Sequence, residues 1–358
     1  MKSHVPFTVT SLENLELQSL VNTACESNAA FFDTAERYGS NLKTAFGLGW
    51  GETEMLTRKL LDRAPTDGVR TVVATKFTPS PWRTTAQSVV DACKESCKRL
   101  GVEKLDLYQL HMPDIVQPLR FLGMGESKDD VYWEGLAECY NQGLVSNVGV
   151  CNYGRSLVLR CQESLGKKGV PLASNQIAYS LIGRHNGAQE TVDLCNENDI
   201  KVLAFFPFAM GLLTGKYTST MSDGMAEETL TSLTKSKKTK LEEMDLNRYA
   251  KGDGNTIPEG GVGPLLGVME TIAKSRGKTI AQIALNYIIC KGAIPIPGAR
   301  TKAQVRDNIG AMGWRLTDTE VSMLETEADK LGFGFEGAGF KRTSEKFVGY
   351  GVEKWTLD

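Results

Sequence analysis

Residues 71–111 read TVVATKFTPSPWRTTAQSVVDACKESCKRLGVEKLDLYQLH, and this stretch decides the fold. Short apolar runs, rich in β-branched and aromatic residues, stand near its two ends, at Thr71–Thr75 and Leu105–Leu110. Between them, apolar residues recur at the intervals typical of one helix face: Val89, Cys93, Cys97 and Leu100. A strand, a helix and a second strand in this order predict a βαβ unit with parallel strands.

The same alternation continues in both directions along the chain. Strands are predicted at Ala29–Asp33, Thr71–Thr75, Leu105–Leu110, Asn147–Val150, Leu172–Gln176, Val202–Phe206 and Ala293–Ile296, with a weaker first strand at Val5–Thr10. Helices are predicted at Glu13–Ser27, Glu52–Asp62, Thr84–Leu100, Asp130–Gln142, Arg155–Lys167, Ala188–Asn198 and Thr279–Lys291. Eight strands, each followed by a helix, predict an α/β fold of the TIM (β/α)8 barrel type in one domain, residues 1–358, whose first strand is short or incomplete.

Two stretches interrupt this rhythm. Residues 218–263 are rich in Ser, Thr, Lys and Gly and have few apolar residues, which predicts a long excursion from one loop that joins a strand to a helix. The tail, residues 331–358, mixes Gly with Phe, Tyr and Trp and lacks a helical period. In a barrel, such a tail is expected to fold over one mouth.

Charge and apolar runs exclude two kinds of partner. The chain of 358 residues has 41 Lys and Arg against 43 Asp and Glu, a formal charge of -2, so no basic surplus favours a nucleic acid. The longest apolar run, Val202–Leu213, is well short of the roughly 20 residues that span a bilayer. We therefore expect no nucleic-acid partner and no membrane span, while the sequence carries no signal for an oligomeric state.

The cysteines indicate a compartment rather than a metal site. None of the eight forms a CxxC pair, and with only three histidines beside them a structural zinc site is not expected. Thiols spread over a long chain are typical of a reducing compartment. Because the N-terminus, MKSHVPFTVT, lacks a signal-peptide core and an Arg-rich transit segment, we expect an intracellular, cytoplasmic protein, or an organellar one if a transit segment has been removed.

Ionisable residues follow three successive predicted strands. Asp33 ends the first, and Tyr38 lies in the loop after it; Lys76 follows the second strand and His111 the third. Barrel enzymes place their chemistry at the carboxyl ends of the strands, so we expect these four side chains to converge on one mouth. A phenol has an unperturbed pKa of about 10, and an adjacent ammonium eases proton donation by favouring the phenolate. A carboxylate would hold that ammonium in place.

Each of the four residues also has a structural interpretation. Asp33 could cap the next turn, and Lys76 could be a solvated loop lysine. His111 could be a core histidine bonded to the backbone, and Tyr38 could pack on the surface. The functional interpretation rests on the coincidence that three successive apolar strands all end in an ionisable residue.

Seven segments, in order, resemble the aldo-keto reductase family: FFDTAERYG (31–39), ATKF (74–77), LDLYQLH (105–111), NVGVCNY (147–153), SNQIAYS (174–180), AFFPFAMGLLTGKY (204–217) and IPIPGARTKAQVRDN (294–308). The resemblance implies a TIM barrel that binds NADPH in extended form, without a Rossmann fold, and reduces aldehydes or ketones. It implies that Tyr38 is the general acid, that Lys76 lowers the pKa of Tyr38 and that Asp33 pairs with Lys76. It also implies that His111 orients the carbonyl.

The resemblance further implies an NADP(H) site. Three residues would hold the nicotinamide carboxamide, and an aromatic ring would stack on it: Cys151, Asn152, Gln176 and Phe205. The loop from Phe206 to Lys216 resembles a pyrophosphate clamp, with contacts expected from Phe206, Pro207, Phe208, Gly211 and Lys216. The adenine and 2'-phosphate would be held by Gly298, Ala299, Arg300, Gln304, Asp307 and Asn308. Arg300 is a natural partner for a phosphate, which favours NADP over NAD.

The chain departs from the family pattern in four places. Cys151 and Phe206 stand where the family commonly has Ser, so one hydroxyl contact to the carboxamide and one to the phosphate are missing. Gln304 stands where many members have Arg, which leaves less positive charge for the 2'-phosphate. Only 32 residues precede Asp33, which makes the first strand short for this family.

The substrate is predicted only as a class. Aromatic and apolar residues in the predicted loops and tail, if they line the mouth, favour an apolar or aromatic carbonyl: Pro81, Trp82, Met112, Phe121, Met124, Phe333, Phe335 and Phe340. Trp82 is the substrate contact that we single out. Packing of the loops among themselves explains the same residues.

Two further functions stay open at this point. A Schiff-base lyase would use Lys76 as its nucleophile, although a paired Asp33 raises the pKa of a lysine and argues against it. A cofactor-binding regulatory subunit without turnover would fit the missing hydroxyls and the short N-terminus.

Overall fold

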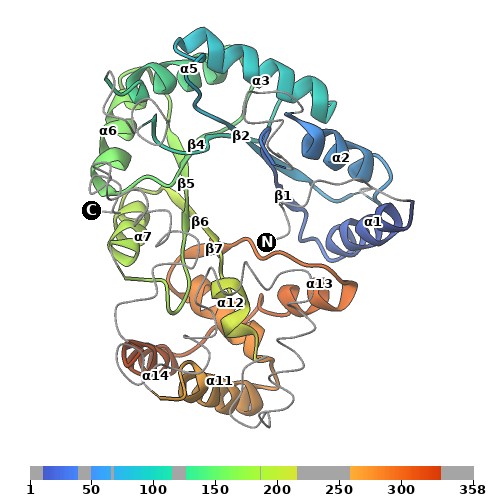
Figure 1. Cartoon of the computed structure of the whole chain (residues 1–358), viewed down its shortest axis with the longest axis vertical. Coiled ribbons are helices and arrows are strands. Elements are labelled where there is room, and N and C mark those ends of the chain that lie inside the picture. The colour runs from blue at the N-terminus through green and yellow to red at the C-terminus, as the bar shows by residue number, and fades with distance from the viewer. Residues whose placement is uncertain are drawn as a thin grey trace.

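The computed structural model describes residues 11–38, 50–65, 68–114, 126–185, 187–215 and 259–331. Seven parallel strands form one sheet in sequence order: β1 (Phe31–Asp33), β2 (Val72–Phe77), β3 (Leu107–Leu110), β4 (Val148–Cys151), β5 (Leu172–Ala178), β6 (Lys201–Phe205) and β7 (Ala293–Pro295). Figure 1 shows the strands following one another along an arc, with the helices on its outer side. The predicted α/β fold of the barrel type is confirmed.

Helices alternate with these strands. They are α1 (Ser11–Glu26), α2 (Glu52–Leu61), α3 (Ala86–Leu100), α5 (Asp129–Asn141), α6 (Arg155–Gly166), α7 (Ala188–Glu197), the 3-10 helix η3 (Ala209–Thr214), α11 (Gly263–Arg276), α12 (Ile280–Cys290), α13 (Lys302–Ile309) and α14 (Asp318–Asp329). Local sequence sets their ends. The side chain of Thr85 accepts the backbone N–H of Ser88 at the start of α3, and Gly101 ends that helix in the left-handed conformation at φ 69°.

The register of the first strands positions the candidate site. Asp33 pairs with Ala74, and Lys76 pairs with Gln109. Paired residues of parallel strands point to the same face, and so do residues two apart along one strand. Asp33, Lys76 and Gln109 are therefore expected on one face at the carboxyl ends of their strands, with His111 one step further along.

The sheet is open between β1 and β7 in the part of the chain that the structure describes. Within the described ranges, β1 pairs with β2 and β7 with β6, and no ladder joins β1 to β7. Helix α1 contacts both α2 and α13, so the outer helices continue across this interval. The predicted first strand, Val5–Thr10, lies outside the described residues.

The core forms between the strands and the outer helices. The four apolar positions that predict the helix at 84–100 are all buried: Val89, Cys93, Cys97 and Leu100. All eight cysteines are free, and Cys290 alone among them is more than marginally exposed. No helix in the described part of the chain has both the length and the apolar character needed to cross a membrane. The same residues contain no cluster of His, Cys, Asp and Glu suited to a metal ion.

Three helices in the C-terminal third were not predicted. They are α11, α13 and α14. Helix α13 has no buried residues, and its sequence accordingly lacks the row of apolar side chains by which a helix is predicted. The predicted excursion at 218–263 lies outside the described residues as far as 258, and α11 begins at its far end. The predicted tail lies outside them after Leu331.

Candidate active site

Three of the predicted site residues meet at the ends of β1 and β2. The Nζ atom of Lys76 donates to Asp33 Oδ2 at 2.5 Å, to the Thr34 carbonyl oxygen at 2.9 Å and to the Tyr38 hydroxyl at 3.1 Å. The Lys76 side chain is fully buried. A buried ammonium requires a paired charge and satisfied protons, and these three acceptors supply both.

His111 lies beside the same phenol. Its ring is 5.4 Å from that of Tyr38, centroid to centroid, in an edge-on arrangement with an interplanar angle of 79°. The backbone N–H of His111 donates to the Phe77 carbonyl at 2.8 Å, which extends the pairing of β2 and β3 to this residue. The carboxyl ends of neighbouring strands thus bring the phenol, the ammonium, the carboxylate and the imidazole together.

Desolvation dominates the electrostatics of Tyr38. It raises the pKa of the phenol to about 12, although the Lys76 ammonium acts in the opposite direction. Burial is the largest single influence on Lys76 and disfavours its charged form, but Asp33, Tyr38 and Cys151 together favour that form, and the net shift of the Lys76 pKa is upward. Lys76 thus lowers the pKa of Tyr38 as expected, while burial decides the net direction, and the phenol keeps its proton at neutral pH.

Two glutamines complete the surroundings of Asp33. Gln176 Nε2 donates to Asp33 Oδ1 at 3.0 Å, and Gln109 Nε2 approaches the same oxygen at 3.4 Å. Gln176 is predicted as a cofactor contact, and here it holds the carboxylate. Gln109 was not predicted, although its place two residues before His111 on one strand was a visible signal.

The end of β4 lies next to this cluster. The amide Nδ2 of Asn152 donates to Cys151 Sγ at 3.2 Å and to the His111 carbonyl at 3.1 Å. The Cys151 thiol lies 3.8 Å from Gln176 Oε1. Burial raises the pKa of Cys151 to about 12, so the thiol stays protonated and can act as a weak donor.

Left-handed backbone marks the predicted cofactor segments. Asn152 has a φ of 65°, and after β6 the same region of φ is occupied by Phe206 at 55°, Ala209 at 45° and Met210 at 59°. Non-glycine residues rarely adopt this conformation, and such residues gather at functional sites. Phe205, only 8% exposed, packs edge-on against Phe206 with ring centroids 5.0 Å apart.

The other predicted residues of this loop differ in burial. Pro207 is buried, and Phe208 and Gly211 are half-buried. Lys216 lies outside the described residues.

The predicted adenine and phosphate site surrounds the start of α13. Arg300 and Gln304 are exposed, and Gln304 Oε1 accepts the Arg300 backbone N–H at 2.7 Å. Asp307 is engaged elsewhere, because Thr279 Oγ1 and Gln282 Nε2 donate to its carboxylate at 2.8 and 3.0 Å. The remaining members are partly or fully open to solvent: Gly298, Ala299 and Asn308.

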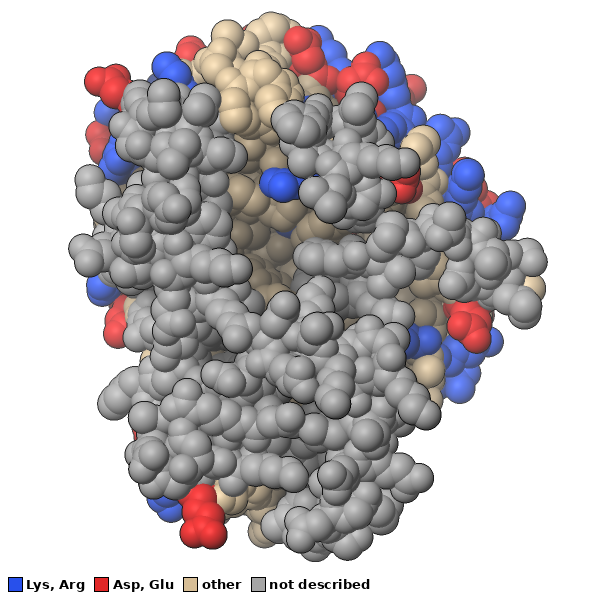
Figure 2. Space-filling view, in the orientation of Figure 1, with Lys and Arg blue, Asp and Glu red and all other residues tan. Residues whose placement is uncertain are grey.

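Aromatic side chains stand near the loop after β2. Trp82 is 52% exposed, and its ring lies 6.2 Å from that of Trp50. Figure 2 shows a central hollow in the face that Figure 1 presents, and the coloured atoms inside it belong mainly to residues other than Lys, Arg, Asp and Glu. The other residues predicted to line a substrate pocket lie outside the described residues, except the half-buried Pro81 and Met112: Phe121, Met124, Phe333, Phe335 and Phe340.

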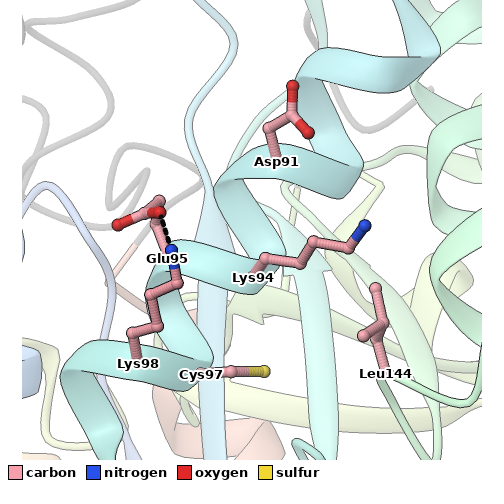
Figure 3. A pocket seen from close by; sticks show the side chains of 6 residues that line it. All are labelled: Asp91, Lys94, Glu95, Cys97, Lys98 and Leu144. Carbon is pink, nitrogen blue, oxygen red and sulfur yellow. Dashed lines mark hydrogen bonds and ion pairs between the residues drawn. The ribbon is translucent and has the colours of Figure 1, made fainter.

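A surface pocket of about 540 Å³ lies elsewhere, against the second half of α3 (Figure 3). Its lining residues are Asp91, Lys94, Glu95, Cys97, Lys98 and Leu144. Helix α3 runs back from the end of β2 to the start of β3, so this pocket lies toward the opposite end of the strands from the cluster around Lys76. It therefore takes no part in the candidate site.

Known proteins resemble this chain over most of its length. The model of the Aldo/keto reductase family matches residues 7–328. The chloroplastic pyridoxal reductase of Arabidopsis thaliana is 35% identical over 325 residues, which cover 89% of this chain and 78% of the reductase. Deoxymugineic acid synthase 1 of Oryza sativa subsp. japonica is 24% identical over 313 residues, 85% of this chain and 79% of the synthase.

Solved structures share the fold. The glycerol dehydrogenase of Gluconobacter oxydans superposes with a TM-score of 0.67 at 20% identity, covering 93% of this chain and 90% of the dehydrogenase. An aldo-keto reductase of Bombyx mori, solved in complex with NADP, superposes with a TM-score of 0.62 at 21% identity, covering 91% and 87%. The chain therefore belongs to the aldo/keto reductase family of oxidoreductases.

Proposed function

We propose that this protein reduces an aldehyde or ketone to an alcohol with NADPH, and that Tyr38 gives the proton to the carbonyl oxygen. The observation that carries the proposal is the position of Lys76 Nζ, 2.5 Å from Asp33 Oδ2 and 3.1 Å from the Tyr38 hydroxyl. A general acid must hold its proton until charge develops on the substrate oxygen. Desolvation raises the pKa of Tyr38 to about 12, so the phenol holds its proton until then. The Lys76 ammonium beside it stabilises the phenolate that remains after the proton has been transferred.

His111 would orient the substrate. Its ring stands edge-on to Tyr38, so a carbonyl oxygen that accepts from the phenol also lies within reach of the imidazole. Two donors aimed at one oxygen fix its direction and stabilise the charge that develops there.

The residues present fit a nicotinamide dinucleotide. The buried amide of Gln176 and the half-buried amide of Asn152 lie beside the Cys151 thiol, and such donors and acceptors match a carboxamide. The left-handed turn after Phe205 and the exposed Arg300 at the start of α13 supply sites of the kind that hold phosphates. A nicotinamide dinucleotide bound there would supply the hydride. The Bombyx mori aldo-keto reductase was solved in complex with NADP, which supports NADP(H) as the cofactor.

A small aromatic aldehyde is the substrate class that we favour. The exposed Trp82 and its neighbour Trp50 offer flat apolar surface near the end of β2, as the sequence predicts for Trp82. Pyridoxal, named in the 35% identical relative, is an aromatic aldehyde and is therefore the first substrate to test.

The geometry disfavours the Schiff-base alternative. Lys76 Nζ donates three hydrogen bonds, and its pKa is raised, so it has no free electron pair for attack on a carbonyl. Borohydride is therefore not expected to trap a substrate on this lysine.

We also infer one domain and a reducing compartment. Contact between α1 and α13 joins the first described helix to the C-terminal third of the chain, and the eight free thiols are compatible with a reducing environment.

Turnover separates the reductase from a regulatory subunit. The full chain, mixed with NADPH and pyridoxal, is expected to consume NADPH and form the alcohol, while Tyr38→Phe binds NADPH with unchanged affinity and loses about 100- to 10,000-fold in kcat. NADPH binding without turnover on a broad panel of aldehydes and ketones would favour the regulatory alternative. Full activity in Tyr38→Phe would refute the role of the phenol.

A further inference from the structure

The buried Glu36 and the half-buried Arg83 form an ion pair next to Tyr38 in the chain. Glu36, 1% exposed, accepts Arg83 Nη1 on Oε1 at 2.5 Å and Arg83 Nη2 on Oε2 at 3.2 Å. Its Oε1 also accepts the backbone N–H of Thr78 at 2.6 Å. A carboxylate engaged by both arms of a guanidinium and by a backbone amide has one permitted direction.

The position of this carboxylate in the chain is what matters for the site. Glu36 lies two residues before Tyr38, and Thr78 lies two residues after Lys76. One side chain therefore ties the turn that carries the phenol to the strand end that carries the ammonium. The distance between those two groups, 3.1 Å, depends on how these segments lie against each other.

The start of α2 also bonds this turn. Thr53 Oγ1 donates to the Ala35 carbonyl at 3.1 Å and lies 3.4 Å from that of Tyr38, and the Gly51 backbone N–H donates to the Glu36 carbonyl at 2.6 Å. The turn is thus fastened to α2 through its backbone and to β2 through the Glu36 side chain. Loss of the second attachment would leave the phenol free to move away from Lys76.

Arg83 extends the connection to the loop after β3. Its guanidinium lies over the rings of Trp50 and Phe77, at 4.7 and 4.9 Å from their centroids. The backbone carbonyl oxygen of Arg83 accepts a hydrogen bond from the Tyr132 hydroxyl at 2.7 Å. That hydroxyl also lies 3.2 Å from Asp114 Oδ1. Asp114 follows His111 by three residues, so the same set of contacts reaches the segment that carries the imidazole.

We propose that Glu36 and Arg83 are positioning residues that hold the Tyr38 phenol against the Lys76 ammonium. The test of this inference by enzyme kinetics rests on the proposed function. A second test, the titration of the Tyr38 phenol followed by spectroscopy, rests on the geometry alone. A displacement of about 1 Å in a reacting group can lower a rate by a factor of 100. Glu36 acts on the phenol only through the chain segments that it joins, so the loss is expected in kcat rather than in KM.

The test uses Glu36→Gln with a matched control, Glu54→Gln. Glu54 is also fully buried and paired with an arginine, Arg99, at 2.5 Å, but it bonds Thr75 rather than the Tyr38 segment. Arg99 Nη2 also lies 4.0 Å from Glu36 Oε2, and Glu54→Gln keeps the arginine that makes this longer contact. Glu36→Gln is expected to lower kcat for aldehyde reduction by about 10- to 100-fold, with KM and the NADPH dissociation constant changed by less than about threefold. It should also raise the solvent deuterium isotope effect on kcat, because proton transfer from Tyr38 becomes slower.

A second readout needs no turnover. With 3-fluorotyrosine at position 38, the fluorine resonance reports the titration of this phenol alone. A phenol that leaves the ammonium but stays buried has a higher pKa, and one that moves into solvent has a lower pKa, so the titration in Glu36→Gln shifts from that of the wild type, whereas that in Glu54→Gln does not. If Glu36→Gln fails to fold, Arg83→Lys keeps the charge but loses the two-pronged contact, and the same shift is expected in smaller measure.

The outcomes separate the two claims. Equal losses of kcat in both glutamine variants, or an unmoved fluorine titration in Glu36→Gln, would overturn the positioning role. If the wild type reduces no carbonyl, the proposed reaction is overturned. The positioning role still stands in that case if the fluorine titration of Tyr38 shifts in Glu36→Gln and not in Glu54→Gln.

Discussion

Lys76 and Asp33 form an ion pair of 2.5 Å in which the lysine side chain is fully buried and the aspartate side chain is 10% exposed. The pair joins neighbouring strands β1 and β2. Gln176, 143 residues further along the chain than Asp33, donates to Oδ1, the carboxylate oxygen that Lys76 does not bond. Such a pair combines a structural and a chemical role, because either partner alone would be a buried, uncompensated charge.

Removal of the lysine is therefore expected to lower both stability and activity. Lys76→Met keeps the length of the side chain but leaves Asp33 unpaired, and the free energy of unfolding should fall by about 3–5 kcal/mol. The double variant Asp33→Asn with Lys76→Met, in which neither charge remains, should recover most of this loss and still show no turnover. Denaturant unfolding and NADPH consumption measure the two effects; a double variant no more stable than the single one would contradict the account.

The pH dependence should differ between the two directions of the reaction. Desolvation raises the pKa of Tyr38 to about 12, so the phenol is protonated throughout the neutral range and its titration leaves aldehyde reduction unchanged there. Alcohol oxidation needs the phenolate as base, and kcat limited by this step should rise about tenfold per pH unit below the pKa. Rates in both directions with the same alcohol and aldehyde pair test this, and a plateau for oxidation near neutrality would show a much lower pKa.

The same shift predicts a loss of stability at high pH. A phenol whose pKa is raised in the folded state contributes fully below the unfolded value, about 10, and its contribution is lost as the pH rises toward 12. Tyr38→Phe should flatten this part of the unfolding profile.

Arg300 is expected to discriminate between the two dinucleotides. It is exposed at the start of α13, where it can reach a 2'-phosphate. Arg300→Ala should raise the dissociation constant of NADPH by about 10- to 100-fold, which corresponds to one lost charge-assisted hydrogen bond, and leave that of NADH unchanged. Fluorescence titration with each dinucleotide measures this, and equal losses for both would place the 2'-phosphate elsewhere.

Acid should loosen the contact between α11 and α14. Two hydrogen bonds from Arg276, at 2.6 and 2.5 Å, lower the pKa of Glu320 to about 2. A carboxyl with a lowered pKa stabilises the fold above its unfolded value, and this contribution is lost as the pH falls toward the folded value. Unfolding of Glu320→Gln between about pH 5 and pH 2 should therefore depend less on pH than that of the wild type. Identical slopes would show that this pair contributes nothing.

Parts of the site were visible in the sequence because they depend on the strand pattern alone. Asp33, Lys76 and His111 end successive strands, and parallel pairing in register brings such ends together. The partners of Gln176 and Asp307 were not visible. Both are predicted cofactor contacts, yet in the structure Gln176 binds Asp33 and Asp307 binds residues at the start of α12. Glu36 and Arg83 gave no signal, since their pairing spans 47 residues and follows no period.

The sequence by itself determined the alternation of strands and helices, the parallel order and the residues that end each strand. These depend on the intervals between apolar residues close together in the chain, which the backbone geometry of helices and strands makes readable. The tertiary structure alone decided the net direction of the Tyr38 pKa and the hydrogen-bond partners of the buried amides and carboxylates. Desolvation and side-chain pairing depend on segments that lie far apart in the sequence, and no local pattern records which of them come into contact.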